Sequence, residues 1–204
     1  MPGRFGGTSN LQRMKLRNNP AGLGPLCALI VEDNEHMRIL LRTLLKAFGI
    51  RDIHECAEGG EALKYLKFKK PDFVLADLLM TPMDGIAFTR SVRALPDKTD
   101  CVLPIIMVTG HTERRRVEGA RDAGVTEILC KPVTPAGLFQ RIEEIVLRPR
   151  PFVRTPTYCG PCRRRRANPD YVGPWRRKGD ADQGRETVSI DEPETPPEKT
   201  AAGQ

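Results

Sequence analysis

The sequence predicts an α/β fold built on a doubly wound, five-stranded parallel sheet, and two observations predict it. Four apolar segments of strand length, rich in β-branched residues, each end in polar residues, which is typical of buried parallel strands. Amphipathic segments of helix length lie between them, so strands and helices alternate along the chain. The four strand segments are residues 26–31, 73–76, 103–108 and 127–130.

Each predicted strand is followed by a predicted helix. The first helix, over residues 34–48, places its apolar residues on one face and ends at Gly49. Those apolar residues are Met37, Leu40, Leu41, Leu44, Leu45 and Phe48. Further helices are predicted over 58–69, 84–95, 112–123 and 134–147, and a weaker strand over 52–56. Five such units favour the strand order 2-1-3-4-5, in which the order reverses between the first and third strands.

Asp77 is the most informative residue of the chain, because it ends a buried strand. A charge there costs several kcal/mol unless it is paired, hydrogen-bonded or metal-bound. Other polar residues end the other strands: Glu32 and Asp33, Thr109 before Gly110, and Lys131 before Pro132. Ligands of this fold bind outside the carboxyl ends of the strands, so these side chains should meet there. A helix N-cap at Asp77 is the simpler alternative, but it leaves the other polar strand ends unexplained.

Together, in this order and each at a strand end, these residues resemble the receiver domain of two-component response regulators, whose fold is flavodoxin-like. The resemblance runs over residues 26–147 and includes Met80 and the run Met83, Asp84 and Gly85 after Asp77. It implies a single-domain response regulator of a phosphorelay. Its expected partners are a sensor histidine kinase or histidine phosphotransfer protein and an unknown downstream protein.

The residue types indicate the chemistry of this site. Asp77 is expected to be the phosphoacceptor, whose carboxylate attacks a phosphoryl group. Charge repulsion in that attack calls for a hard cation, and Glu32, Asp33 and Asp77 supply oxygen ligands that suit Mg²⁺. Lys131 and Thr109 are expected to contact phosphoryl oxygens. The resemblance adds the backbone carbonyl of Leu79 as a metal ligand. We expect no enzyme activity beyond self-phosphorylation from small donors and autodephosphorylation.

Two positions depart from the family pattern. Thr81 stands where many receivers carry proline, with Pro82 one position later, which should only adjust the loop after the third strand. Ile128 stands where many receivers carry Tyr or Phe, whose rotation follows the phosphate-bound threonine. We therefore expect Asp77 to be phosphorylated, but the output surface to change less or through a different element.

The flanks carry the positive charge of this chain of 204 residues, whose formal net charge is +7. Residues 1–25 are expected to form a flexible extension, and 148–204 a disordered tail rich in Pro and Gly. The segment 26–147 has a net charge of −1, whereas 148–178 has +9 and 179–204 has −5. No segment is apolar over the ~20 residues of a membrane span, and no signal peptide is present, so we expect a cytoplasmic location.

The basic segment 148–178 supports an alternative function: a tail-driven binder of nucleic acid or another anionic surface, regulated by the receiver. A solvated tail whose acidic end neutralises the basic segment is the simpler interpretation. Two copies of the pattern Tyr-x-Gly-Pro-x-Arg-Arg, beginning at Tyr158 and Tyr171, favour a repeated contact. The first copy contains Cys159 and Cys162, spaced as in a redox dithiol but without the strand and helix that should flank one.

Overall fold

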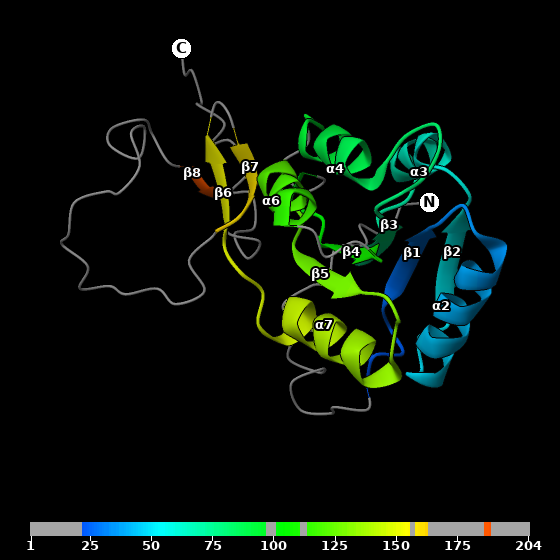
Figure 1. The fold of residues 1–204 in the computed structure, drawn as a ribbon. Coiled ribbons are helices and arrows are strands. Elements are labelled where there is room, and N and C mark those ends of the chain that lie inside the picture. The colour runs from blue at the N-terminus through cyan, green and yellow to red at the C-terminus, as the bar shows by residue number, and fades with distance from the viewer. Residues whose placement is uncertain (1–21, 97–100, 111–113, 156–157, 163–185, 189–204) are drawn as a thin grey trace, which may run out of the picture.

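The computed structural model describes residues 22–96, 101–110, 114–155, 158–162 and 186–188. The main sheet has five parallel strands in the order β2-β1-β3-β4-β5, which confirms the predicted fold (Figure 1). The strands are β1 (Cys27–Val31), β2 (Asp52–Cys56), β3 (Phe73–Asp77), β4 (Ile105–Thr109) and β5 (Glu127–Cys130). The helices are α2 (Glu35–Ala47), α3 (Gly59–Leu66), α4 (Gly85–Arg93), α6 (Arg114–Ala123) and α7 (Pro135–Leu147). Element ends differ from the predicted ones by a few residues, as ends commonly do.

Helices cover both faces of this sheet (Figure 1). One face packs against α2 and α7, and the other against α3, α4 and α6. Neighbouring residues of a strand point to opposite faces, so Ile30 packs in the first of these cores and Leu29 in the second. Strands β3 and β4 are buried along their whole lengths. This two-sided burial is why their sequences are continuous apolar runs rather than alternating ones.

Polar caps fix where three helices begin. The side chains of Asn34, Asp84 and Thr134 each accept a hydrogen bond from the backbone N–H three residues further on, at 3.1, 2.7 and 3.1 Å. Such caps satisfy donors that the first turn of a helix leaves unpaired. The N-cap of α4 is therefore Asp84, and the alternative that Asp77 serves as a helix N-cap is wrong.

Regular structure continues past residue 147 within residues 148–155 and 158–162, which corrects, for these residues, the prediction of a disordered tail from residue 148. Strands β6 (Phe152–Thr155) and β7 (Tyr158–Pro161) form an antiparallel hairpin, and β8 (Glu186–Val188) pairs with the other edge of β6. Arg150, just before β6, donates to the carbonyl of Thr126 and pairs with Glu127 at 3.1 Å. Strands this short, within a segment rich in Pro and Arg, give no periodic signal in the sequence.

A buried arginine joins the hairpin to the main domain. The guanidinium of Arg93 donates hydrogen bonds of 2.7–3.0 Å to the carbonyls of Cys101, Leu103 and Gly124. The ring of Phe152, which is 2% exposed, covers this guanidinium at 5.0 Å. Burial lowers the pKa of Arg93 to about 10, so the group stays charged at neutral pH and its carbonyl acceptors are needed.

Two glycines allow β7 to approach the turn between α6 and β5. Gly124 has φ +93°, a conformation that favours glycine, and a Cβ there would collide with the carbonyl oxygen of Cys159. A Cβ on Gly160 would lie 2.7 Å from the Cα of Gly124. The glycine in the first Tyr-x-Gly-Pro copy is thus required by packing. The second copy, at Tyr171, lies outside the described residues.

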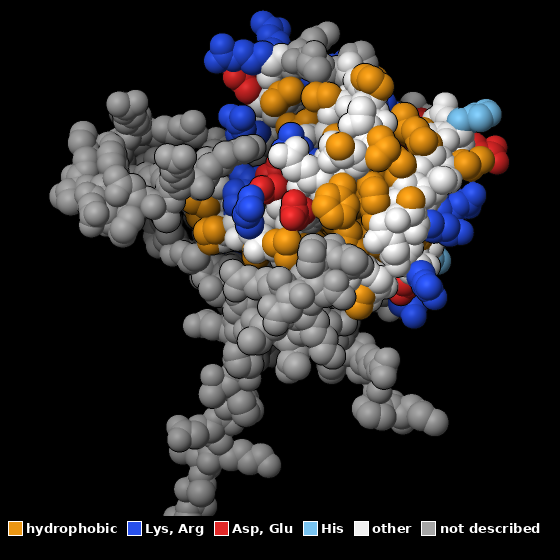
Figure 2. All heavy atoms as spheres, turned by 90° about the horizontal axis from the view of Figure 1, so that it is seen from below, with side chains coloured by type: hydrophobic (Ala, Val, Ile, Leu, Met, Phe, Trp, Pro, Cys, Tyr) orange, Lys and Arg blue, Asp and Glu red, His pale blue; other side chains and the backbone are white. Residues whose placement is uncertain are grey.

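The surface of the domain carries charges of both signs. On the face shown in Figure 2, Lys and Arg side chains lie near Asp and Glu side chains, with hydrophobic ones between them. This mixture agrees with the net charge of −1 over residues 26–147. Within the described part of the chain, none of the helices combines the length and the apolar content that a membrane span requires.

Replacing Phe152→Ala should lower the free energy of unfolding by about 3 kcal/mol, because the substitution empties a buried site and uncovers the Arg93 guanidinium. Denaturant unfolding of the full chain measures this change. Phe68→Ala is the matched control, since the Phe68 side chain is 85% exposed and its loss should change stability by less than about 0.5 kcal/mol. Equal effects of the two substitutions would show that the hairpin does not dock.

Candidate functional site

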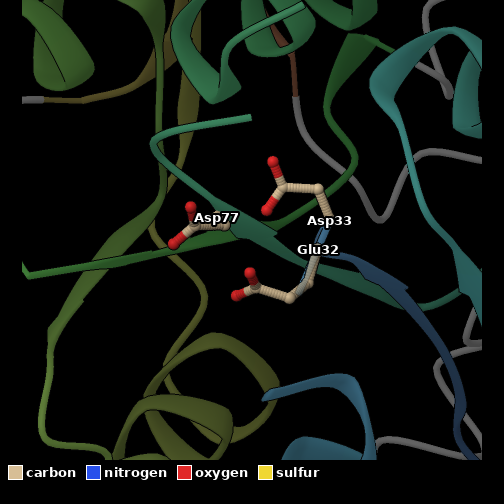
Figure 3. Close-up of side chains that lie close together, drawn as sticks. All are labelled: Glu32, Asp33 and Asp77. Atoms are coloured by element: carbon tan, nitrogen blue, oxygen red, sulfur yellow. The ribbon is translucent and has the colours of Figure 1, made fainter. Parts of the chain in front are cut away.

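Three carboxylates meet at the carboxyl edge of the main sheet. Glu32 and Asp33 directly follow β1, and Asp77 is the last residue of the neighbouring strand β3. One carboxylate oxygen from each residue lies within 4.8 Å of the others, and Figure 3 shows the side chains converging from the two strands. The sequence prediction that these three acids come together is therefore confirmed by the geometry.

Asp77 is buried and held by two partners. Its side chain is 6% exposed, its Oδ1 lies 2.6 Å from the Nζ of Lys131, and its Oδ2 accepts a hydrogen bond of 2.9 Å from the N–H of Leu79. Lys131 follows β5, so its side chain reaches across the end of β4 to the end of β3. This ion pair joins strands that are not neighbours in the sheet.

Glu32 is the second buried carboxylate. Its Oε2 lies 3.3 Å from the Lys131 Nζ, and its Oε1 accepts a hydrogen bond of 3.3 Å from the Asn34 N–H. Burial, and then the charge of Asp77, raise the pKa of Glu32 above its ordinary value. Burial alone would lower the pKa of Lys131, but its hydrogen bonds and ion pairs with Asp77 and Glu32 outweigh burial and raise it. Lys131 is therefore an ammonium at neutral pH.

The charges of this cluster do not balance. Three carboxylates face one ammonium, which leaves an excess of negative charge at a largely buried edge. A small divalent cation with a preference for oxygen ligands, such as Mg²⁺, would offset this excess. The donor set therefore fits the predicted metal. The carbonyl of Leu79 as a further ligand stays a prediction, whereas its N–H is already bonded to Asp77.

Arg38 positions the turn that carries Asp33. Its guanidinium donates to the backbone carbonyls of Glu32 at 2.7 Å and Asp33 at 3.1 Å, and lies 3.9 Å from Glu55 on the next strand. The sequence carries no signal for this role of Arg38, because an arginine on an amphipathic helix is ordinarily a solvated surface residue. Only the contact with the turn identifies its role.

Gly85 places the start of α4 directly against the site. Its N–H donates to the carbonyl of Leu78 at 3.0 Å, and a Cβ at this position would collide with the backbone carbonyl of Asp77. Any larger residue would push α4 away from the end of β3. The Asp84 and Gly85 pair of the sequence motif is thus explained as a helix cap followed by a close approach of two backbones.

The predicted phosphate contacts lie beside this cluster. Thr109 ends β4 and is 3% exposed, and its carbonyl accepts a hydrogen bond of 2.7 Å from the Lys131 N–H. A Cβ built on Gly110 would meet no atom within 4 Å, which leaves open space next to Thr109. His111, the residue after Gly110, lies outside the described residues. Thr109, Lys131 and Asp77 are therefore brought to one edge as predicted.

Ile128 lies behind Thr109, in an apolar pocket between the sheet and α6. The pocket is lined by Leu78, Met107, Thr109, Arg116, Val117, Ala120 and Ile128. The Ile128 side chain is half-buried, and its partly buried neighbours include Ile86. Because Thr109 lines this pocket, a movement of its side chain would change the packing around Ile128.

Known proteins are similar to this domain in sequence. Residues 28–143 match the response regulator receiver domain family. Chemotaxis protein CheY-3 of Vibrio cholerae is 35% identical over 120 residues, which cover 59% of this chain and 91% of that protein. Chemotaxis protein CheY of Pseudomonas aeruginosa is 37% identical over 120 residues, which cover 59% of this chain and 95% of that protein.

Solved structures share its fold. A putative response regulator from Chloroflexus aurantiacus has a TM-score of 0.56 at 31% identity, over 60% of this chain and 98% of that one. The receiver domain of a sensor histidine kinase from Pseudomonas aeruginosa has a TM-score of 0.54 at 29% identity, over 60% of this chain and 97% of that one. That second structure holds a magnesium ion in its active site cleft.

Asp33→Asn should weaken Mg²⁺ binding at least about tenfold, because it removes one anionic ligand of the cluster. The Asp33 side chain is exposed, so the free energy of unfolding of the metal-free protein should change by less than about 0.5 kcal/mol. Titration calorimetry with MgCl₂ measures the affinity, and NaCl at equal ionic strength corrects for screening.

Glu35→Gln is the matched control for this measurement. Glu35 is an exposed acid two residues further on, and it does not belong to the cluster. Its replacement should leave Mg²⁺ affinity within about twofold of the wild type, since it changes only a charge outside the cluster, whose effect on the cation is screened by salt. Equal losses of affinity in the two variants would mean that Mg²⁺ senses the general charge of this edge rather than a built site.

Proposed function

Because the chain belongs to the response regulator receiver domain family, we propose that it is a single-domain response regulator in which phosphorylation of Asp77 switches a protein–protein contact. One observation carries this proposal: the buried Asp77 carboxylate belongs to a cluster of three acids and lies 2.6 Å from the Lys131 ammonium. A phosphoacceptor needs a nucleophilic oxygen and nearby cationic groups for the incoming charge.

Asp77 acts as the nucleophile. One of its carboxylate oxygens forms the new bond to phosphorus, while the bond between phosphorus and the leaving atom of the donor breaks. The product is an aspartyl phosphate. The donor is the phosphohistidine of a sensor histidine kinase or histidine phosphotransfer protein, or a small phosphodonor. The Leu79 N–H fixes the orientation of the carboxylate, because it holds Oδ2 at 2.9 Å.

Lys131 and Thr109 receive the transferred group. The raised pKa of Lys131 keeps its ammonium charged, so it can pair with a phosphoryl oxygen once Asp77 is phosphorylated. The Thr109 hydroxyl, at the end of the adjacent strand, donates to another phosphoryl oxygen, and the open space beside Gly110 accommodates the group. These contacts favour a product conformation in which Thr109 has moved toward Asp77.

Glu32, Asp33 and Asp77 are the residues that would hold Mg²⁺, with the Leu79 carbonyl as a further ligand. When bound, Mg²⁺ neutralises charge on the phosphoryl oxygens and on the attacking carboxylate. The carboxylates themselves fix where the cation and the phosphoryl group can lie, since Arg38 and Gly85 hold the two loops that carry them. We propose no enzyme activity toward other substrates, only self-phosphorylation from small donors and autodephosphorylation. The cytoplasmic location stays a prediction.

The alternative function, binding of an anionic partner by the basic segment, stays a prediction because residues 163–178 lie outside the described part of the chain. The structure does change how it should be tested. A truncation at Arg148 would remove the docked hairpin and Phe152 together with the basic segment. A truncation after Cys162 keeps the hairpin and removes the basic residues that follow it.

Incubation with Mg²⁺ and acetyl phosphate should add one phosphoryl group to the wild-type protein and none to Asp77→Asn, because the amide is not a nucleophile for phosphorus. Intact mass spectrometry measures the adduct, with chelation of Mg²⁺ as a further condition. Asp84→Asn is the matched control: Asp84 caps α4 and should leave phosphorylation unchanged. An adduct on Asp77→Asn, or one independent of Mg²⁺, would contradict the proposed function.

Phosphorylation should change the β5 and α7 surface less in this protein than in an Ile128→Tyr variant, because isoleucine cannot swing a ring into the space behind Thr109. Hydrogen exchange of residues 127–147, with and without a beryllofluoride phosphoryl mimic, measures the change. We expect strong protection of residues 78–84 in both proteins and a change at 127–147 mainly in the variant. A large change at 127–147 in the wild type would disprove this prediction.

A further inference from the structure

Two thiols from distant parts of the chain meet where the hairpin docks. Cys101 lies just before β4 and is fully buried, and Cys159 lies on β7 and is half-buried. The Cys159 S–H donates a weak hydrogen bond of 3.8 Å to the backbone carbonyl oxygen of Cys101, which places the Cys159 sulfur directly against Cys101. Both pack against Val102 and Phe152. This contact is long-range and arises only because the hairpin folds back on the domain.

The surroundings make the two thiols chemically unequal. The hydrogen bond from Cys101, followed by the positive charges of Arg93 and Arg154, lowers the pKa of Cys159 to about 6 against the effect of burial. The same hydrogen bond and burial raise the pKa of Cys101. Cys159 is therefore the more acidic thiol of the pair and the one that more readily forms a thiolate. A thiolate with partial exposure is the reactive form of cysteine.

Cys162 is not the natural partner of Cys159, although the two share the Cys-Gly-Pro-Cys spacing. Strand β7 is extended over Tyr158–Pro161, so residues three apart lie about 10 Å from each other and point to opposite faces. Disulfides require Cα atoms within about 7 Å. Cys130 is exposed at the far, carboxyl end of β5. The spacing of the motif therefore does not give a disulfide pair, and the packing places Cys101 beside Cys159.

We propose that Cys101 and Cys159 form a reversible disulfide under mild peroxide, which fastens the hairpin to the domain. The Cys159 thiolate attacks one oxygen of hydrogen peroxide, which gives a sulfenic acid and hydroxide. The Cys101 sulfur then attacks the sulfenic sulfur, the S–O bond breaks, and water leaves with the Cys101 proton. Two thiols are oxidised and one peroxide is reduced to two waters. A thiol reductant such as glutathione restores the pair.

The consequence is structural rather than catalytic. The disulfide lies at the amino end of β4, whereas Asp77 and Thr109 lie at the carboxyl ends of β3 and β4. Oxidation would therefore leave the phosphoacceptor edge in place. It would make the docking of β6 and β7 covalent, and so fix the point from which the chain continues into its arginine-rich segment.

The test is to oxidise the full-length reduced protein with hydrogen peroxide, block remaining thiols with N-ethylmaleimide, and map the tryptic peptides. Trypsin places Cys101 in the peptide 99–114, and both Cys159 and Cys162 in the peptide 155–163. A Cys101 to Cys159 bond joins the two peptides, whereas a Cys159 to Cys162 bond stays within 155–163. We expect the joined pair, with two fewer alkylated thiols in the intact mass, and its loss on reduction.

Two variants assign the sulfurs. The joined pair should persist in Cys162→Ser and disappear in Cys159→Ser. A bond within 155–163, a disulfide between two chains, or six alkylated thiols after oxidation would each overturn the proposal. The mapping is decided on the wild-type protein, so a variant that weakens hairpin docking does not obscure the answer. The peptide map does not depend on phosphorylation of Asp77. A protein that is not phosphorylated could therefore still form the disulfide, and the two proposals can fail separately.

Discussion

The Lys131 ammonium between two buried carboxylates is the interaction on which the rest of the site depends. Its Nζ lies 2.6 Å from Asp77 and 3.3 Å from Glu32, both of which are almost fully buried. Without this cation, two like charges would face each other in a medium that screens them poorly. One ammonium cannot neutralise three carboxylates, however. The remaining negative charge would favour a divalent cation, so the imbalance of the cluster fits the proposed Mg²⁺ site.

The main sheet and the charged residues at its edge could be predicted from the sequence, because they depend on patterns of neighbouring residues. Buried parallel strands are continuous apolar runs, and a polar residue at the end of such a run is costly unless it is used. Those two facts locate Glu32, Asp77 and Lys131 at one edge without any knowledge of contacts. The strand order follows from the alternation of strands and helices. Because each strand ends where the first polar residue appears, most element ends could also be predicted to within a few residues.

The rest could not be predicted, because it depends on contacts between distant segments. Arg93 is an arginine on an amphipathic helix, and only the folded chain shows that its guanidinium is buried beneath Phe152. The hairpin is composed of short strands in a segment whose Pro and Arg content indicates disorder. The spacing of Cys159 and Cys162 along the chain could not show which residue packs against either of them. In the folded chain Cys159 packs against Cys101.

Strand β4 connects the candidate phosphorylation site to the cysteine pair. Thr109 ends it beside the phosphoacceptor, and Cys101 lies just before it beneath the hairpin. The five residues of β4, Ile105–Thr109, are all buried and span about 16 Å of extended backbone, and Cys101 lies four residues before the strand. Groups separated by more than about 10 Å ordinarily contribute independently. A central strand packed on both faces is also the least deformable element of the domain. The proposed phosphorylation and the proposed thiol oxidation would therefore be separate inputs, one acting on the loops around Asp77 and the other on the docking of the hairpin.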